Sequence, residues 1–377
     1  MADLSTTFTG IRFENPFLLA SAPPTESESN IVRAYEAGWG GVVTKTIGLH
    51  PVDNVRGPKT KFLRMDDGGS RLSMTKRPGS TVVASWNWEL ISDKPIDWWI
   101  GRLSAIKKAW PDRVLVASIM AGSGNDKELR NWQVLTEAVQ DAGVDAIELN
   151  FSCPHMDRVD MGANVGKDPV LCSVSTQAVK EVARVPVWVK LTPATADIVE
   201  EARASFLGGA DAISSSNTFP ALPPIDPVTL DFEVNVDGLV SSGGLGGPAI
   251  LAQSLAKMAQ LTQAFPDHEF SGLGGISSFD QALSYFLLGC GTVQVATAAM
   301  LDHAIGPNVI AGLKAGMTAL LERNADRGWR SLADFRGLRR GSVVAHSQIG
   351  RPGAADYHGG YDDEAEGYAR ELTKAQG

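Results

Sequence analysis

Cysteine is scarce in this sequence, and that scarcity limits the chemistry it can support. The 377 residues include only Cys153, Cys172 and Cys290, with no CxxC pair and no spacing of the secreted kind. We therefore expect three reduced thiols. Three dispersed cysteines cannot supply the four thiolates of an ordinary iron–sulfur cluster. The six histidines show no HExxH or similar spacing, so the sequence gives little support for zinc.

Long apolar runs and an excess of basic residues are also lacking. Lys and Arg number 34 against 43 Asp and Glu, for a net charge of -9, so no basic stripe is available to neutralise nucleic-acid phosphates. The chain begins MADLSTTFTG, without the charged and apolar regions of a signal peptide, and no window approaches the ~18 apolar residues of a membrane span. We expect a cytoplasmic protein that binds neither nucleic acid nor membrane.

A repeated local pattern indicates the fold. A helix-like stretch ends in glycine, and a short apolar strand rich in β-branched residues follows at once. Glycine suits the left-handed position after a helix, and the apolar run suits a parallel strand that is buried on both faces. The pattern occurs at Gly38, Gly143, Gly209 and Gly289. Such units are typical of βα repeats.

Eight strand candidates follow from this pattern. They span residues 16–22, 41–46, 113–120, 144–150, 185–191, 210–216, 269–275 and 291–296. With helical patterns between most of them, they predict an α/β fold of the (β/α)8 TIM-barrel type. A doubly wound sheet is the alternative, but its glycine-rich fingerprint should follow the first strand, where this chain has Ser21-Ala22-Pro23-Pro24.

We assign the predicted barrel to residues 1–324, which include two insertions, and a C-terminal extension follows it. Insertions at about 47–110 and 219–246 follow strands and therefore lie on the C-terminal rim, where barrel active sites are found. They are candidate lids or pocket walls. Residues 325–377 form a C-terminal extension that includes the basic cluster 336–340, and we assign this extension no catalytic role.

Many rim segments together resemble one family. In chain order they are Phe17-Leu18-Leu19-Ala20-Ser21-Ala22, Thr44-Lys45-Thr46, Asn87-Trp88-Glu89-Leu90-Ile91-Ser92, Ala117-Ser118-Ile119-Met120, Asn150-Phe151-Ser152-Cys153-Pro154-His155, Lys190-Leu191-Thr192-Pro193, Ser216-Asn217-Thr218, Gly274-Gly275-Ile276 and Val293-Gln294-Val295. The chain is similar from about residue 5 to about residue 320 to the FMN-binding barrel of dihydropyrimidine dehydrogenases and, more distantly, to dihydroorotate dehydrogenases. The resemblance implies an FMN-dependent oxidoreductase that acts on a CH–CH or C=C bond of a small heterocycle, such as uracil, thymine or their 5,6-dihydro forms.

Cofactor residues are expected at the strand ends. Lys45 and Lys190 follow the second and fifth strands, where an ammonium can stabilise charge on a reduced flavin, although each could be an ordinary surface lysine. Loops after strands seven and eight of such barrels bind phosphate through backbone amides. The phosphate candidates are Gly274, Gly275, Ala296 and Thr297, together with Gly246 and Gly247 ahead of a helix predicted at 248–266. The resemblance further implies cofactor contacts from Ala20, Ser21, Thr46, Asn150 and Asn217.

Cys153 is the candidate general acid or base. A lone cysteine is more often a small buried hydrophobe, but this one follows the fourth strand on the functional rim, and both families place a Cys or Ser acid/base at the matching point. A thiol with a pKa of about 8.5 can exchange a proton near neutral pH. His155 is predicted to tune it or to hold the loop. For Cys172 and Cys290 we expect packing roles.

Asparagines are the candidate substrate ligands. A pyrimidine edge alternates carbonyl acceptors and N–H donors, and a side-chain amide presents both functions. Asn87, Asn150 and Asn217, with the hydroxyl of Thr218, come from three separate rim segments, and Glu89 of the Asn87 segment is a further candidate substrate ligand. Any one asparagine at a strand end could instead be a turn former.

Two departures from the family leave questions open. After His155 the chain reads MDRVDMGANVGKDP, with Asp157, Arg158 and Asp160 where dihydropyrimidine enzymes tend to have glycines, so the substrate ring stays open. The chain also lacks the cysteines and the length for the iron–sulfur and FAD domains of the family's long enzymes. We therefore expect an electron-transfer partner protein, a quinone or a soluble acceptor, and a homo-oligomer, dimer or higher.

Other functions are weighed against this one. A dihydroorotate dehydrogenase-like enzyme would need a cationic or amide grip on a carboxylate, which the sequence neither confirms nor excludes. A reductase of another cyclic substrate is a further possibility. A flavin-free lyase or isomerase could bind a phosphorylated substrate at the loops after strands seven and eight. A non-catalytic subunit is disfavoured because Lys45, Asn150, Cys153 and Lys190 occur together.

Overall fold

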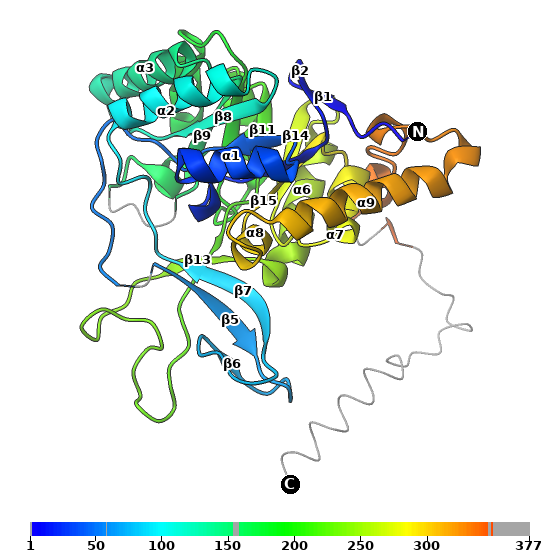
Figure 1. Ribbon diagram of the computed structural model, residues 1–377. Helices are drawn as coiled ribbons and strands as arrows, with labels where there is room; N and C mark the ends of the chain where they lie inside the picture. The colour runs from blue at the N-terminus through cyan, green and yellow to red at the C-terminus, as the bar shows by residue number, and fades with distance from the viewer. Residues whose placement is uncertain (1, 58, 154–157, 346–347, 350–377) are drawn as a thin grey trace. The chain divides into compact units, whose positions relative to one another are not determined.

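The fold is seen in a computed structural model, which describes residues 2–57, 59–153, 158–345 and 348–349. The chain divides into two compact units, Met1–Arg340 and Gly341–Gly377. The first unit holds the barrel and the insertions on its rim (Figure 1). No helix in the described ranges is long and apolar enough to cross a lipid bilayer.

Within the described residues, eight parallel strands close into a barrel. They are β3 (Phe17–Leu19), β4 (Gly41–Val43), β8 (Val114–Ile119), β9 (Ala146–Phe151), β10 (Val187–Leu191), β11 (Ala212–Ser215), β14 (Glu269–Leu273) and β15 (Thr292–Val295). Each pairs in parallel with the next, and β15 closes the ring on β3. The predicted TIM barrel is confirmed, and the doubly wound alternative is wrong. Each of the eight barrel strands falls on a predicted one apart from small shifts at the ends.

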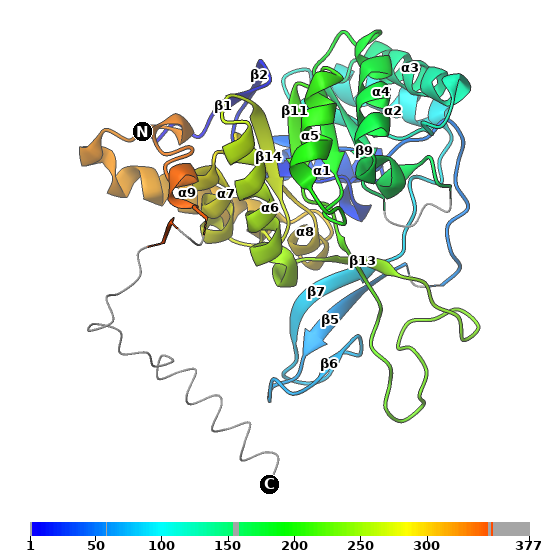
Figure 2. The same ribbon diagram turned by 180° about the vertical axis from the view of Figure 1, so that it is seen from behind.

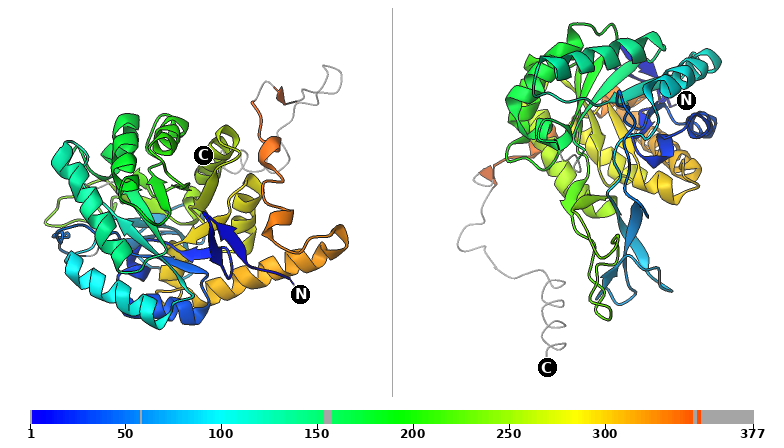
Figure 3. Two further views of the ribbon diagram at one scale, coloured as in Figure 1. Left: turned by 90° about the horizontal axis from the view of Figure 1, so that it is seen from above. Right: turned by 90° about the vertical axis from the view of Figure 1, so that its left-hand side faces the viewer.

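Helices form the outer layer of the barrel (Figure 3). They are α1 (Glu28–Ala37), α2 (Ile96–Ala109), α3 (Asp126–Asp141), α4 (Pro169–Lys180), α5 (Ile198–Leu207), α6 (Leu251–Ala264), α7 (Phe279–Leu288), α8 (Thr297–Leu301) and α9 (Pro307–Arg323). Figure 2 shows α4, α5 and α6 side by side over the strands. Gly38 and Gly289 end α1 and α7 in the left-handed conformation, with φ of 99° and 119°, as the repeated pattern predicts.

Apolar side chains close the N-terminal end of the barrel. A hairpin of β1 (Thr6–Phe8) and β2 (Ile11–Phe13) lies there, and the rings of Phe8 and Trp188 meet edge to face with centroids 5.0 Å apart. Along β10, Val187 and Val189 join the core beneath the helices, whereas Trp188 belongs to a separate cluster inside the barrel. Because alternate residues of a strand share a face, Lys190 continues the inward row towards the opposite end.

The rim insertions fold together. β12 (Phe219–Ala221), β13 (Gly243–Gly246), β7 (Thr81–Asn87), β5 (Thr60–Met65) and β6 (Leu72–Ser73) form a five-stranded antiparallel sheet in that order. Trp86 and Trp88 are buried with Val234 in a small apolar cluster that is separate from the barrel core. Figure 1 shows this sheet at the end of the barrel opposite β1 and β2. The rim therefore carries a wall built from two distant segments.

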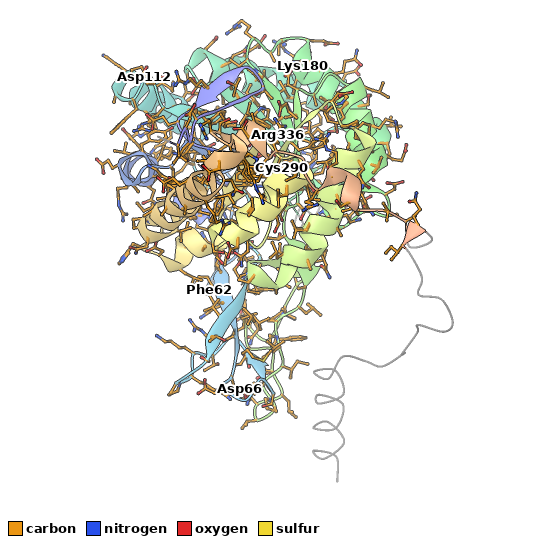
Figure 4. The ribbon with its side chains drawn as sticks, turned by 90° about the vertical axis from the view of Figure 1, so that its right-hand side faces the viewer. Phe62, Asp66, Asp112, Lys180, Cys290 and Arg336 are labelled. Carbon is orange, nitrogen blue, oxygen red and sulfur yellow. The ribbon has the colours of Figure 1, made fainter. Side chains whose placement is uncertain are left out.

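The first part of the C-terminal extension packs on the barrel. Phe335 contacts Phe286 of α7 with ring centroids 6.3 Å apart, and the backbone N–H of Gly337 donates to the Phe286 carbonyl. The guanidinium of Arg336 pairs with Glu269 at 2.6 Å. Figure 4 shows Arg336 beside Cys290, far from the insertion residues Phe62 and Asp66. Residues 325–340 thus belong to the same compact unit as the barrel.

Candidate active site

One large pocket lies at the C-terminal end of the barrel, beneath the insertion sheet. It has a volume of about 1030 Å³ counted to its open mouth. Every described residue predicted for the site lines it, namely Ala20, Ser21, Lys45, Thr46, Asn87, Glu89, Asn150, Cys153, Lys190, Asn217, Thr218, Gly246, Gly247, Gly274, Gly275, Ala296 and Thr297. His155 lies outside the described residues, so its role stays a prediction. The shared pocket puts the other candidates within reach of one ligand.

Two lysines enter the pocket, each paired with a carboxylate. The ammonium of Lys45 lies 3.0 Å from the carboxylate of Glu89, and the two side chains are only 11 % and 9 % exposed. The ammonium of Lys190 lies 3.8 Å from Glu148, which is fully buried on β9. Burial lowers the pKa of Lys190, and the Glu148 carboxylate acts in the opposite direction. Within the described part of the lining, these lysines are the only cationic side chains, and neither stands without a counter-charge.

A chain of hydrogen bonds holds two of the asparagines. The amide of Asn150 donates to the Thr46 hydroxyl at 2.9 Å, and its carbonyl accepts from the Ser152 hydroxyl at 2.8 Å. Asn217 in turn donates to that Ser152 hydroxyl at 2.7 Å. Three barrel segments are thereby fixed relative to one another. Each amide keeps lone pairs or N–H groups beyond these bonds, which a ring substrate can use.

Cys153 lies two residues beyond β9 and is 6 % exposed. Its backbone carbonyl accepts a hydrogen bond from the N–H of Ala163 at 2.9 Å, so the chain folds back against it. All three cysteines are without a disulfide, as predicted. Cys172 and Cys290 are fully buried outside the pocket lining, and burial raises the pKa of both thiols. Cys153 is therefore the cysteine that a ligand in this pocket can meet.

The charged residues after Cys153 face a helix. Arg158 contacts Glu128 of α3 at 2.8 Å and Asp160 at 2.7 Å, and the carbonyl of Asp160 accepts from the N–H of Ser123. Neither Arg158 nor Asp160 lines the pocket, and Asp157 lies outside the described residues. These two charges fix the returning segment to the barrel, so they are poor candidates for selecting the substrate.

The predicted phosphate residues form a glycine-lined cradle. A β-carbon at Gly274 would lie 2.3 Å from the Ser254 hydroxyl oxygen, and one at Gly275 would lie 2.6 Å from Leu251. Both positions have positive φ, 118° and 79°, so their backbone reaches the pocket without a side chain. The hydroxyl oxygens of Ser85 and Thr297 lie 2.7 Å apart, and both residues line the same pocket. Bare backbone and hydroxyls are suitable donors for a phosphate.

Sequence reasoning assigned no role to five polar residues of the site. Four of them line the pocket, namely Thr60, Ser85, Ser216 and Gln294, and Glu148 lies beneath it. Glu148 carried a usable signal, because it is the one charged residue of the buried strand β9 and shares the face of Asn150 two positions on. Ser85 gave no such signal, since it belongs to the insertion sheet and reaches the rim only through the fold.

The chain is similar to several known proteins. Residues 91–317 match the model of the dihydroorotate dehydrogenase family. The chain is 36 % identical to a chloroplastic NADP(+) dihydropyrimidine dehydrogenase of Arabidopsis thaliana over 92 % of this chain and 79 % of the relative. It is 34 % identical to the NAD-dependent dihydropyrimidine dehydrogenase subunit PreA of Escherichia coli, over 93 % and 80 %. The catalytic subunit of dihydroorotate dehydrogenase B (NAD(+)) of Methanosarcina mazei is 31 % identical, over 89 % and 95 %.

Proposed function

The chain belongs to the dihydroorotate dehydrogenase family, whose members are oxidoreductases acting on CH–CH bonds, and we propose that it interconverts a neutral pyrimidine and its 5,6-dihydro form with FMN. Uracil and thymine are the substrates in view. The relatives named as dihydropyrimidine dehydrogenases support this choice. A flavin-free lyase or isomerase has no such support.

The charge balance of the pocket is the observation that carries the choice of a neutral ring. Lys45 and Lys190 already have carboxylate partners, and Glu89 adds a negative charge to the lining itself. No arginine or histidine stands in the described part of the lining. A substrate carboxylate would lack an unengaged cation there, whereas a ring with amide and carbonyl groups needs only hydrogen bonds.

The residues present fit FMN. Backbone at Gly246, Gly247, Gly274 and Gly275, with Thr297, would hold the phosphate, and Lys45, Thr46, Asn150 and Lys190 would face the polar edge of the isoalloxazine. When bound, FMN supplies the hydride chemistry that amino-acid side chains lack. Because the two ammonium groups are buried, their charge is weakly screened and favours a negatively charged ring beside them.

The protein's own contribution is to orient the substrate and to move a proton. Asn87, Asn150 and Asn217 would bind the alternating donors and acceptors of the ring edge. The thiol of Cys153 would give a proton to one carbon of the C=C bond during reduction and take it back during oxidation. The fixed backbone of Cys153 limits where that proton can go. A dihydroorotate dehydrogenase-like activity is the second candidate, favoured by the archaeal relative.

We expect the purified chain to carry one FMN held without a covalent bond. The glycine-lined cradle and the two buried lysines are the physical reasons. Release by heat or acid, followed by chromatography and a protein assay, measures the identity and the ratio. FAD in place of FMN, or no flavin after reconstitution with FMN, would sink the proposal.

We also expect that the chain alone exchanges electrons poorly with NADH or NADPH and relies on a partner protein or a soluble acceptor. The names of two relatives describe them as subunits, which supports a partner. Three cysteines leave the chain without an iron–sulfur relay. Stopped-flow reduction of the flavoprotein by each nicotinamide is the test. Reduction as fast as steady-state turnover would show that no partner is needed.

A further inference from the structure

Glu148 is a buried carboxylate that the reaction proposed above does not use. It lies on β9 and is 0 % exposed. One of its oxygens, Oε2, accepts a hydrogen bond from Nε2 of Gln294 at 2.8 Å. The other, Oε1, has no hydrogen-bond partner within the described residues, and the Lys190 ammonium stands 3.8 Å from it. The carboxylate is thus placed against a lysine of the pocket floor.

A lone buried carboxylate is costly, so its surroundings must account for it. Burial without compensating contacts disfavours the charged form of a carboxylate or an ammonium group. A close opposite charge stabilises that charged form again. Gln294 satisfies one oxygen with a neutral donor and cannot balance the charge. Lys190 is the cation that can, and the two residues stabilise each other's charged form.

The neighbours of Lys190 leave its positive charge strongly dependent on Glu148. β10 lies between β9 and β11, and the residues of β11 (Ala212–Ser215) carry no charge. On the pocket side, Lys45 repels Lys190 but is itself paired with Glu89, and Cys153 lines the same pocket. Burial, which is the largest cause, and Lys45 hold the pKa of Lys190 below its ordinary value, and the Glu148 carboxylate opposes that shift.

We propose that Glu148 is a positioning residue that keeps Lys190 positively charged at the pocket floor, so that a reduced cofactor ring always meets an ammonium. The proposal rests on the FMN-dependent function above. In this proposal three residues have separate roles. Glu148 holds the proton on Lys190, Gln294 holds Glu148 in place, and Lys190 presents the positive charge to the ligand.

Removing the carboxylate should expose a titration that the wild type hides. In Glu148→Gln the amide can still accept from Gln294, but nothing then opposes burial and Lys45. The pKa of Lys190 should therefore fall further, so that the lysine loses its proton at a lower pH than in the wild type. An anionic reduced ring favours the protonated lysine, so reduction would take up an extra proton wherever Lys190 is neutral in the oxidised protein.

The pH dependence of the redox potential of the bound flavin reports the titration of Lys190 without a measurement of activity. One extra proton per two electrons changes the equilibrium constant tenfold per pH unit, which steepens the potential by about 30 mV per pH unit. We expect this added slope in Glu148→Gln and its absence in the wild type between about pH 6 and pH 9. At the acidic end the variant's potential should lie above that of the wild type, because a negative charge has been removed.

Two further variants make the test specific. Glu148→Gln combined with Lys190→Met should lose the added slope, since the titrating group is gone. Glu269→Gln removes a carboxylate from another barrel strand, where Arg336 is its partner, and should leave the slope unchanged. A wild-type slope in Glu148→Gln, or an added slope that survives Lys190→Met, would overturn the proposal.

The wild type alone also tests the idea if Glu148→Gln fails to fold or to bind FMN. The proposal requires that the wild-type potential show no lysine titration between about pH 6 and pH 9. A break in that range that disappears in Lys190→Met would mean that Glu148 does not hold the charge. A wild type that binds no FMN would refute the proposed function instead, so the two failures can be told apart.

Discussion

Cys153→Ala should lower turnover by about 10²–10⁴-fold, the usual contribution of a positioned general acid or base, while FMN stays bound. The thiol lines the pocket, and its backbone is braced by the hydrogen bond from Ala163. Alanine keeps that backbone bond and removes only the sulfur. The loss should therefore appear in the step that moves a proton and leave flavin content unchanged.

The measurement is steady-state turnover with dihydrouracil across pH, together with the flavin-to-protein ratio of each preparation. Cys290→Ala is the matched control, because it removes a buried thiol at the opposite side from the insertion sheet, outside the pocket lining (Figure 4). Its turnover should match the wild type. If Cys153→Ala also turned over at the wild-type rate at every pH, the Cys153 thiol would be a packing residue only.

The barrel could be predicted from the sequence because its signals are local. Each βα unit combines a helix, a glycine that ends it and a strand buried on both faces, and Gly38 and Gly289 adopt the conformation that this pattern requires. The strands then follow in chain order around the ring, so no long-range choice of partner was needed. Lys45 and Lys190 were placed at strand ends by the same reasoning, whereas Ala20, Ser21, Thr46, Asn150 and Asn217 were expected from the resemblance to the dihydropyrimidine dehydrogenase barrel.

The insertion sheet could not be predicted, since its pairing is not local. β13 reads Gly-Gly-Leu-Gly, which has low strand propensity, and it pairs with β7 from a segment more than 150 residues earlier (Gly244 with Asn87). The ion pair of Lys45 with Glu89 depends on where that sheet lies over the barrel. Charge pairing in the pocket therefore had to come from the structure.

The pairing of Lys45 with Glu89 leads to the second large effect. We expect kcat/KM for dihydrouracil to exceed that for dihydroorotate by about 10–100-fold. Bringing a carboxylate beside Glu89, with both lysines engaged, should cost about 1.5–3 kcal/mol, the range of a hydrogen bond to a charged group left unmade. Glu89→Gln removes the repelling charge and leaves the Lys45 ammonium without its carboxylate partner. This variant should therefore lower the ratio of kcat/KM for dihydrouracil to kcat/KM for dihydroorotate, mainly by raising kcat/KM for dihydroorotate.

Competition between the two substrates, measured as the ratio of their kcat/KM values in each protein, tests this expectation. Glu322→Gln is the matched control, because Glu322 is exposed on α9 and stands outside the pocket lining, so that the same loss of one negative charge should leave the ratio near the wild-type value. A ratio that changes equally in both variants would point to overall charge rather than to Glu89. A wild type that prefers dihydroorotate would contradict the argument from charge balance and favour the second candidate function, since some cation in or near the pocket would then have to bind the carboxylate.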